Sequence, residues 1–147
     1  EDVEHGLYAV SWPARFEVVA DEPFFVVDGG HNPQCAQTVA DNLNSYFPGT
    51  RRVLLMGVLA DKDYMTMTDI LNEAADEYVC VTPDSPRALP AAKLGECLAR
   101  FGKKVSVADS IRDGVGMAID AAAGGGMVCA VGSLYMAGEI RGCFGLK

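Results

Sequence analysis

The sequence predicts a three-layer α/β fold, in which helices cover a mostly parallel six-stranded sheet with one antiparallel strand. Three observations predict it. Short apolar runs alternate with segments of helical periodicity along most of the chain. The last five of the six runs are almost continuously apolar, which is typical of strands covered on both faces. The link between the first two runs is too short for a crossover helix, so they are expected to form an antiparallel hairpin.

The expected elements follow in a regular order. Asn32 is a good helix N-cap and Pro33 suits a first helical position, so a helix is predicted to begin there and to stop near Gly49. A last helix is predicted from Ser133 to Arg141. The six expected strands are Phe16–Ala20, Phe24–Asp28, Arg52–Val58, Glu77–Val81, Lys104–Ala108 and Met127–Val131. The other helices have apolar faces that include Met67 and Leu71, Leu94 and Leu98, and Ile111 and Val115.

Length and composition limit the classes of protein to which the chain can belong. It has 147 residues, of which 50% are hydrophobic, and this suffices for one domain with a core. Its net charge of −8 and the lack of a basic segment argue against a nucleic-acid-binding protein. The five scattered cysteines favour reduced thiols over disulfides or a metal site. Neither a membrane-spanning stretch nor a leader pattern is visible, so a cytoplasmic protein is expected.

The segment Asp28-Gly29-Gly30-His31-Asn32-Pro33 follows the second strand, at the edge where parallel sheets bind ligands. Its glycines permit a tight turn, and the start of the next helix offers N–H groups to an anion. Asp28 is a candidate acceptor for ribose hydroxyls, and His31 is a candidate partner for a carboxylate or phosphate. From this segment alone, a capped strand-to-helix turn with an exposed His31 is the slightly favoured interpretation.

Three further candidates lie near other strands. Lys62 comes just after the third strand, where its ammonium is either a point charge for a carboxylate or phosphate, or a solvated surface group. Ser133 follows the last strand and either caps the last helix or binds an anion together with the helix amides. Arg15 precedes the first strand, where its guanidinium either matches a phosphate or is structural or solvated.

Several familiar motifs are missing from the sequence. It contains no G-x-x-x-x-G-K-[ST], and no G-x-G-x-x-G follows a strand, so neither a P-loop nor a dinucleotide site is predicted. Nothing indicates a Ser/His/Asp or Cys/His nucleophile. Of the two histidines, His5 and His31, only His31 is a plausible base. No metal site is predicted within the chain.

Five short segments lie in order between Trp12 and Glu139 and span nearly the whole chain. They are Trp-Pro-Ala-Arg-Phe-Glu, Asp-Gly-Gly-His-Asn-Pro, Gly-Val-Leu-Ala-Asp-Lys-Asp-Tyr, Thr-Pro followed by Pro-Arg-Ala-Leu-Pro, and Gly-Ser-Leu-Tyr-Met-Ala-Gly-Glu. Together they resemble the C-terminal domain of the folylpolyglutamate synthases/dihydrofolate synthases, of the Mur ligase family. The resemblance implies a Rossmann-like fold with one antiparallel strand. It also implies that residues 1–147 form one glutamate-binding domain of a larger two-domain enzyme.

For the nucleotide side, the resemblance implies three roles. Arg15 would reach the phosphates of ATP, Asp28 would contact the ribose, and Asn32 would lie near the nucleotide. The sequence departs from the family at Ala14, where Gly is usual, and at Gly30, where Ala is usual. Both changes are small and concern the rigidity of the loops.

For the amino-acid side, the resemblance implies that His31 lies close to the incoming L-glutamate. Lys62 and Ser133 would hold its carboxylates, and His31 and Lys62 would be the catalytic residues. In the family's reaction, ATP phosphorylates a carboxylate of folate or dihydropteroate, and the amino group of glutamate attacks the acyl phosphate. The family's P-loop, Mg²⁺ ligands and most of its pterin pocket lie in the preceding domain, so this domain alone is expected to be inactive.

Two other interpretations stay open. Another Mur-type ligase, adding a different amino acid, would share Lys62 and Ser133, although Asp-Gly-x-His-Asn-Pro and Trp-Pro-x-Arg favour folate. A non-catalytic nucleotide-binding or receiver-like module would need an acidic pair after its first parallel strand and a phosphorylatable Asp at a later strand end. Asp28 stands alone after its strand and Gly57 ends the next, which disfavours a receiver.

Overall fold

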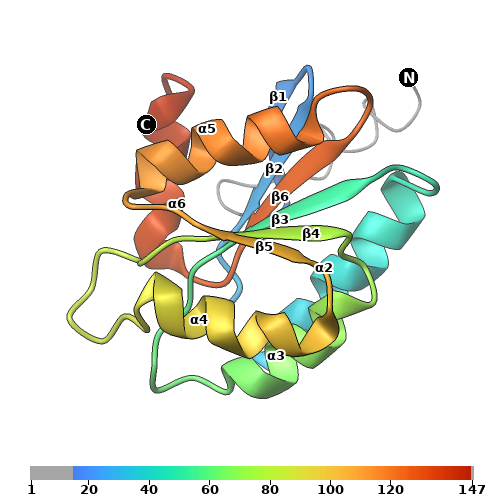
Figure 1. Cartoon of the computed structure of the whole chain (residues 1–147). Coiled ribbons are helices and arrows are strands. Elements are labelled where there is room, and N and C mark those ends of the chain that lie inside the picture. Colours follow the sequence, from blue (N-terminus) through green and yellow to red (C-terminus); the bar gives the residue numbers. More distant parts are fainter. Residues whose placement is uncertain (1–14, 147) are drawn as a thin grey trace.

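A computed structural model describes residues 15–146, which form a six-stranded sheet with helices on both faces (Figure 1). The strand order is β1-β2-β6-β3-β4-β5. The first two strands pair antiparallel, and all other neighbours pair parallel. The three-layer α/β class and the N-terminal hairpin are therefore confirmed. The strands are β1 (Glu17–Asp21), β2 (Phe24–Asp28), β3 (Arg52–Met56), β4 (Glu77–Cys80), β5 (Lys104–Val107) and β6 (Met127–Val131).

The helices divide unequally between the two faces of the sheet. The described segments are α2 (Pro33–Tyr46), α3 (Tyr64–Asn72), α4 (Ala91–Leu98), the short η1 (Ala99–Phe101), α5 (Ile111–Ala122) and α6 (Leu134–Cys143). Helices α2, α3 and α4 cover one face, and α5 and α6 cover the other (Figure 1). Within residues 15–146, none of the helices has the length and apolar character needed to cross a bilayer.

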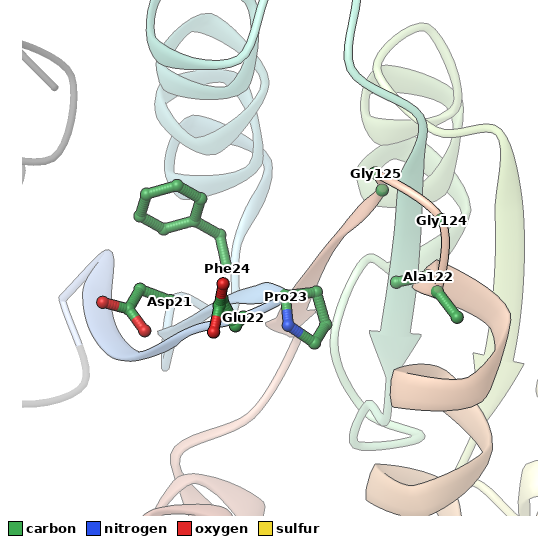
Figure 2. A pocket seen from close by; sticks show the side chains of 9 residues that line it. Asp21, Glu22, Pro23, Phe24, Ala122, Gly124 and Gly125 are labelled. Carbon is green, nitrogen blue, oxygen red and sulfur yellow. The ribbon is translucent and has the colours of Figure 1, made fainter.

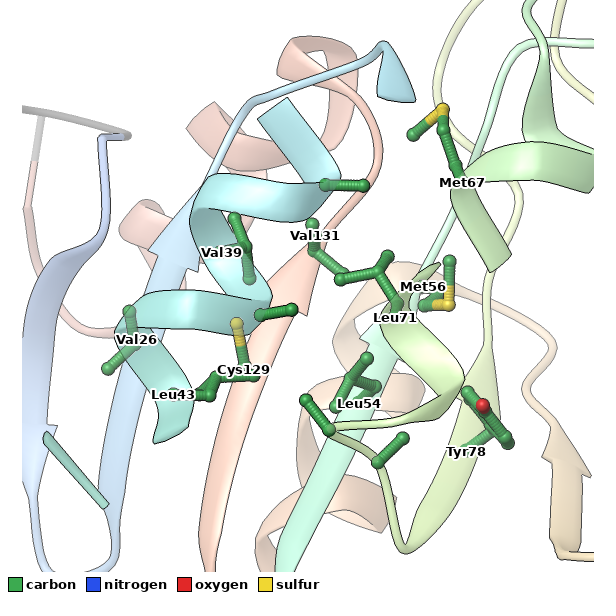
Figure 3. Packing of buried hydrophobic residues seen from close by; sticks show 14 of the residues in the cluster. Val26, Val39, Leu43, Leu54, Met56, Met67, Leu71, Tyr78, Cys129 and Val131 are labelled. Carbon is green, nitrogen blue, oxygen red and sulfur yellow. The ribbon is translucent and has the colours of Figure 1, made fainter. Parts of the chain in front are cut away.

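The core consists of two apolar layers, one on each face of the sheet. On the larger face, Leu43 of α2 and Leu71 of α3 pack over Leu54 and Cys129 of the central strands (Figure 3). Each fully buried leucine stabilises the fold by about 1.5–3 kcal/mol through removal of its side chain from water. The opposite layer joins strand residues such as Phe25 to Ile140 of α6. The central strands β3, β4 and β6 are buried along their whole length, as their continuous apolar runs predicted.

Strand β5 departs from the expectation that it would be covered on both faces. It lies at the end of the sheet next to β4, and its four residues are exposed or only half-buried. The run Lys104–Ala108 was therefore wrongly assigned to the sheet interior. Its alternation of Lys and Ser with Val is the pattern of an edge strand rather than of a central one.

The chain order brings three loops together at the carboxyl edge of the sheet. Strand β6 lies between β2 and β3, so the loops that follow these three strands are neighbours. The contact is close: Gly132, just after β6, has a φ of +121°, and a Cβ there would lie 2.2 Å from the carbonyl oxygen of Gly57. Only glycine fits this position, since it lacks a Cβ and tolerates positive φ. Helices α2 and α6 both begin at this edge.

Candidate functional site

Two adjoining pockets open at the carboxyl edge. The Lys62 pocket has a volume of about 220 Å³, and the Asp28 pocket has a volume of about 300 Å³. The Lys62 pocket is lined by His31, Leu59, Lys62, Arg87, Ser133, Leu134 and Tyr135. The Asp28 pocket is lined by Arg15, Asp28, Gly29, Gly30, His31, Cys35, Thr38 and Leu134. Because His31 and Leu134 line both pockets, these two residues form the boundary between them.

Lys62 is half-buried in its pocket, and neither acid beside it in the sequence neutralises it. The carboxylate of Asp61 pairs with Arg87 at 2.8 Å, while Asp63 accepts a hydrogen bond from the backbone N–H of Thr66 and caps α3. Among residues 15–146, no carboxylate forms a salt bridge with the Lys62 ammonium. The pocket therefore presents a cation whose charge is left for an external anion.

Ser133 combines the two roles that the sequence left open. It is only 2% exposed, and its hydroxyl oxygen accepts a hydrogen bond of 3.0 Å from the backbone N–H of Tyr135, so it caps α6. The same hydroxyl retains its own proton for donation to a ligand. The start of α6 adds the positive end of the helix dipole to the Lys62 pocket.

Arg87 lies in the Lys62 pocket but was given no role by sequence reasoning. Its Nη1 contacts Asp61 at 2.8 Å, and both side chains are about half exposed. Its backbone carbonyl accepts a hydrogen bond from Ala60 N–H at 2.8 Å, and Leu59 and Ala88 form an isolated antiparallel bridge. The loops that follow β3 and β4 are therefore joined, and this places Arg87 beside Lys62. The Pro-Arg-Ala-Leu-Pro segment was the available signal, but only the tertiary pairing of the loops reveals its position.

Asp28 closes the turn at the end of β2. Its two carboxylate oxygens accept hydrogen bonds from the backbone N–H groups of Gly30, at 2.8 Å, and Phe16, at 2.9 Å. Burial raises the pKa of Asp28 above its ordinary value, while these two hydrogen bonds and the charge of Arg15 act in the opposite direction. Each carboxylate oxygen has two lone pairs, so Asp28 can still accept a ligand hydroxyl while it holds the turn.

The other two nucleotide-side candidates differ in their placement. Arg15 is exposed and lines the Asp28 pocket. Asn32 is the N-cap of α2, where its side-chain oxygen accepts the N–H of Cys35 at 2.8 Å. Its predicted capping role is confirmed, but it does not line either pocket. A nucleotide role for Asn32 stays a prediction.

The electrostatic character of the two pockets differs from that of the whole chain. The net charge of the chain is −8, yet among the described residues the two pockets contain three basic side chains, from Arg15, Lys62 and Arg87, and one acidic side chain, from Asp28. Two helix N-termini also face this edge. The arrangement suits a polyanion with hydroxyl groups in the Asp28 pocket and carboxylates in the Lys62 pocket. Within residues 15–146, no group of three or more His, Cys, Asp or Glu side chains could hold a metal ion.

Residues 14–134 match the family model described as Mur ligase, glutamate ligase domain. The chain belongs to the Mur ligase family. This match covers both carboxyl-edge loops that carry His31 and Lys62, and it ends at the start of α6. The assignment agrees with the resemblance found in the sequence.

Known proteins similar to this Mur ligase domain are named folylpolyglutamate synthases, some of them bifunctional with dihydrofolate synthase. This chain is 34% identical over 145 residues to the folylpolyglutamate synthase of Lacticaseibacillus casei, and the match covers 96% of this chain and 32% of that protein. A Mycobacterium tuberculosis folylpolyglutamate synthase complexed with ADP has a TM-score of 0.86 at 31% identity, over 97% of this chain and 34% of that one. A bifunctional folylpolyglutamate synthase/dihydrofolate synthase with Mn, AMPPNP and L-glutamate bound has a TM-score of 0.84 at 26% identity. That match covers 94% of this chain and 33% of the other. The chain thus spans about a third of these relatives.

Proposed function

We propose that this chain is the glutamate-binding C-terminal domain of a folylpolyglutamate synthase/dihydrofolate synthase, an ATP-dependent ligase that forms an amide. Residues 1–147 would form one domain of a larger two-domain enzyme. The preceding domain would supply the P-loop, the Mg²⁺ ligands and most of the pterin pocket. The domain alone would be inactive, because its sequence has no P-loop.

One observation carries this proposal. The Lys62 ammonium has no carboxylate partner among residues 15–146, and it lies in the same pocket as Arg87 and the capping hydroxyl of Ser133. The unpaired ammonium of Lys62, the guanidinium of Arg87, which is shared with Asp61, and a helix N-terminus suit a ligand with two carboxylates, which is the chemistry of L-glutamate. Lys62 and Ser133 were assigned to the glutamate carboxylates by resemblance, and Arg87 joins them.

The Asp28 pocket would hold the nucleotide. Arg15 would face its phosphates, Asp28 would accept a ribose hydroxyl, and Asn32 would lie nearby at the start of α2. The adjoining positions of the two pockets support this division, because the acyl phosphate made with ATP must then be attacked by the amino group of the amino acid. ATP, when bound, supplies the phosphoryl group that makes a folate or dihydropteroate carboxylate reactive.

His31 would act where the two pockets meet. Its side chain lines both of them, and it is half-buried. The ammonium form of an amino acid must lose a proton before its nitrogen can attack a carbonyl carbon, and an imidazole is the usual proton acceptor near neutral pH. His31 would therefore position glutamate and take a proton from its amino group, while Lys62 holds a carboxylate and stabilises negative charge nearby.

The proposal is tested with the longer protein that carries this chain. Titration calorimetry should show binding of ATP and L-glutamate, and ADP should be released in a glutamate-dependent manner with folate or dihydropteroate as acceptor. Absence of glutamate-dependent ADP release with either acceptor would overturn the proposal. A screen of other amino acids, in which one of them replaced glutamate as the preferred substrate, would instead assign the chain to another Mur-type ligase.

A further inference from the structure

Leu134 is an apolar side chain in an unusual place. It is 57% exposed, the highest value among the large exposed hydrophobic residues of residues 15–146. Among residues 15–146, His31 and Leu134 alone line both the Lys62 pocket and the Asp28 pocket. Exposure of an apolar leucine side chain to water is energetically unfavourable. Ligands that filled both pockets would cover this side chain.

The position of Leu134 is well determined by its neighbours. Ser133 caps the helix immediately before it, and Met136 and Ala137, which follow within the same turn, are almost fully buried against the sheet. The start of α6 is therefore anchored to the core by these two side chains and by its cap. Leu134 projects from a rigid support at the boundary of the two pockets, rather than from a mobile loop.

The chemistry at this boundary has a competing reaction. An acyl phosphate can be attacked at its carbonyl carbon by the amino group of the amino acid: the C–N bond forms, the C–O bond to phosphate breaks, and the amine loses a proton. Water attacks the same carbon with the same leaving group, giving back the carboxylate and inorganic phosphate. Both routes release one ADP per acyl phosphate formed, but only the first makes an amide. A side chain that excludes water from this carbon therefore determines the yield of amide per ATP.

We propose that Leu134 is the water-excluding wall over the acyl phosphate, and so a specificity-determining residue for amine over water. This inference rests on the function proposed above. The side chain of Leu134 offers no donor, acceptor or charge, and so it can neither bind a carboxylate nor move a proton. What it can do is occupy, with apolar surface, the space between nucleotide and amino acid from which an attacking water would come.

The test uses the longer protein and measures two products in the same reaction, ADP and the glutamyl amide. Leu134→Asn keeps a similar size but introduces a polar group that holds water, Leu134→Ala opens space, and Leu134→Met retains apolar bulk. Met65→Ala is the matched control, because Met65 is 49% exposed and lines neither pocket. We expect Leu134→Asn to raise the ratio of ADP to amide by roughly tenfold, Leu134→Ala to raise it less, and Leu134→Met and Met65→Ala to leave it unchanged.

The outcomes separate this inference from the proposed function. If the unsubstituted protein forms the glutamyl amide but Leu134→Asn keeps the parent ratio of ADP to amide, the water-excluding role is overturned and the proposed function stands. A loss of both products in equal proportion, with unchanged thermal unfolding, would also overturn it, because it would indicate a binding or domain-docking role. If the unsubstituted protein makes no amide, the proposed function itself has failed.

Discussion

Both edges of the sheet carry pockets, and the amino-edge pocket that contains Asp21 and Glu22 differs in charge from the two pockets at the carboxyl edge. At the amino edge, a pocket of about 480 Å³ is lined by Asp21, Glu22, Pro23, Phe24 and residues 122–126 (Figure 2). It is larger than the Lys62 pocket or the Asp28 pocket. Its charged lining residues are the two acids Asp21 and Glu22, whereas the carboxyl edge presents Arg15, Lys62 and Arg87.

The direction of the strands adds a contribution from the backbone to this difference. In a parallel sheet, each strand delivers its carboxyl end to the edge where the next helix begins, so α2 and α6 direct N–H groups toward the carboxyl edge. At the amino edge, α5 ends at Ala122 and directs its carbonyl groups there. The helix ends therefore attract an anion to the first edge and repel one from the second, although Arg51 and Arg52 line a further pocket at the amino edge. The size of a pocket is therefore a poorer guide to this site than the polarity of the elements that frame it.

The largest effect is expected on the free energy of unfolding, when one glycine at each edge of the sheet is replaced by alanine. Gly132 and Gly125 have similar positive φ values, +121° and +108°, but a Cβ on Gly132 meets the Gly57 carbonyl at 2.2 Å, while nothing lies within 4 Å of one on Gly125. We expect Gly132→Ala to lower the free energy of unfolding by about 3 kcal/mol or more. Gly125→Ala should cost only about 1–2 kcal/mol of backbone strain. Urea unfolding of the chain measures both, and equal losses would contradict the close contact of the two loops.

Removal of the Lys62 charge should have the next largest effect. In the proposed two-domain enzyme, Lys62→Ala is expected to lower kcat/KM for glutamate by roughly 100-fold, because a charge-assisted contact to a carboxylate is lost. Steady-state ADP release measures this effect. Lys93→Ala is the control at an exposed position outside both pockets, and Glu22→Gln tests the amino edge. A comparable loss of kcat/KM in Glu22→Gln would contradict the functional difference between the amino-edge pocket and the Lys62 pocket.

A smaller effect is expected for Arg87, which lies nearer the solvent. Arg87→Ala should raise KM for glutamate by about tenfold, as expected for loss of one partly solvated contact to a carboxylate. Asp61→Asn, which removes only the partner of Arg87, should raise it less, because the backbone bridge between Leu59 and Ala88 still places the loop. If Asp61→Asn proved the more harmful of the two in the same kinetic assay, Asp61 rather than Arg87 would be the residue in contact with substrate.

The smallest expected effect concerns the pH dependence of stability. Burial raises the pKa of Asp28 in the folded state above its ordinary value of 3.8, so the folded chain binds this proton more tightly than the unfolded chain does. The resulting contribution to stability is present below the ordinary value and is lost as the pH rises through the folded value. Urea unfolding of the parent chain and of Asp28→Asn, repeated across this range, should give a difference that declines with rising pH and then levels off. A difference that grew with pH would mean that the hydrogen bonds from Gly30 and Phe16 outweigh burial.

Local patterns in the sequence predicted much of the fold. The apolar runs gave the central strands because a strand buried on both faces has no polar positions, and β6 was predicted with the correct bounds. The cap at Asn32 and the start of α2 were predicted because the Asn-Pro pair acts through its immediate neighbours. The predictions were less accurate for the ends of β3 and β4 and for the exposure of β5. Hydrogen-bond pairing and edge position depend on which strands are neighbours.

The candidate site divides in the same way. Strand ends followed by polar residues indicated Asp28, His31, Lys62 and Ser133, but not how they are grouped. Only the fold shows that the acids flanking Lys62 are engaged elsewhere, by Arg87 and by the cap of α3. It also shows that Arg87 joins the same pocket and that Leu134 separates two pockets.

The sequence by itself determined the class of fold, the family resemblance and the edge at which polar residues collect, because these follow from periodicity and from short-range contacts. The tertiary structure decided the strand order and, with it, which loops touch. Strand β6 lies between β2 and β3, although β3, β4 and β5 separate it from β2 in the sequence. That choice depends on packing between residues far apart in sequence, and no local pattern records it.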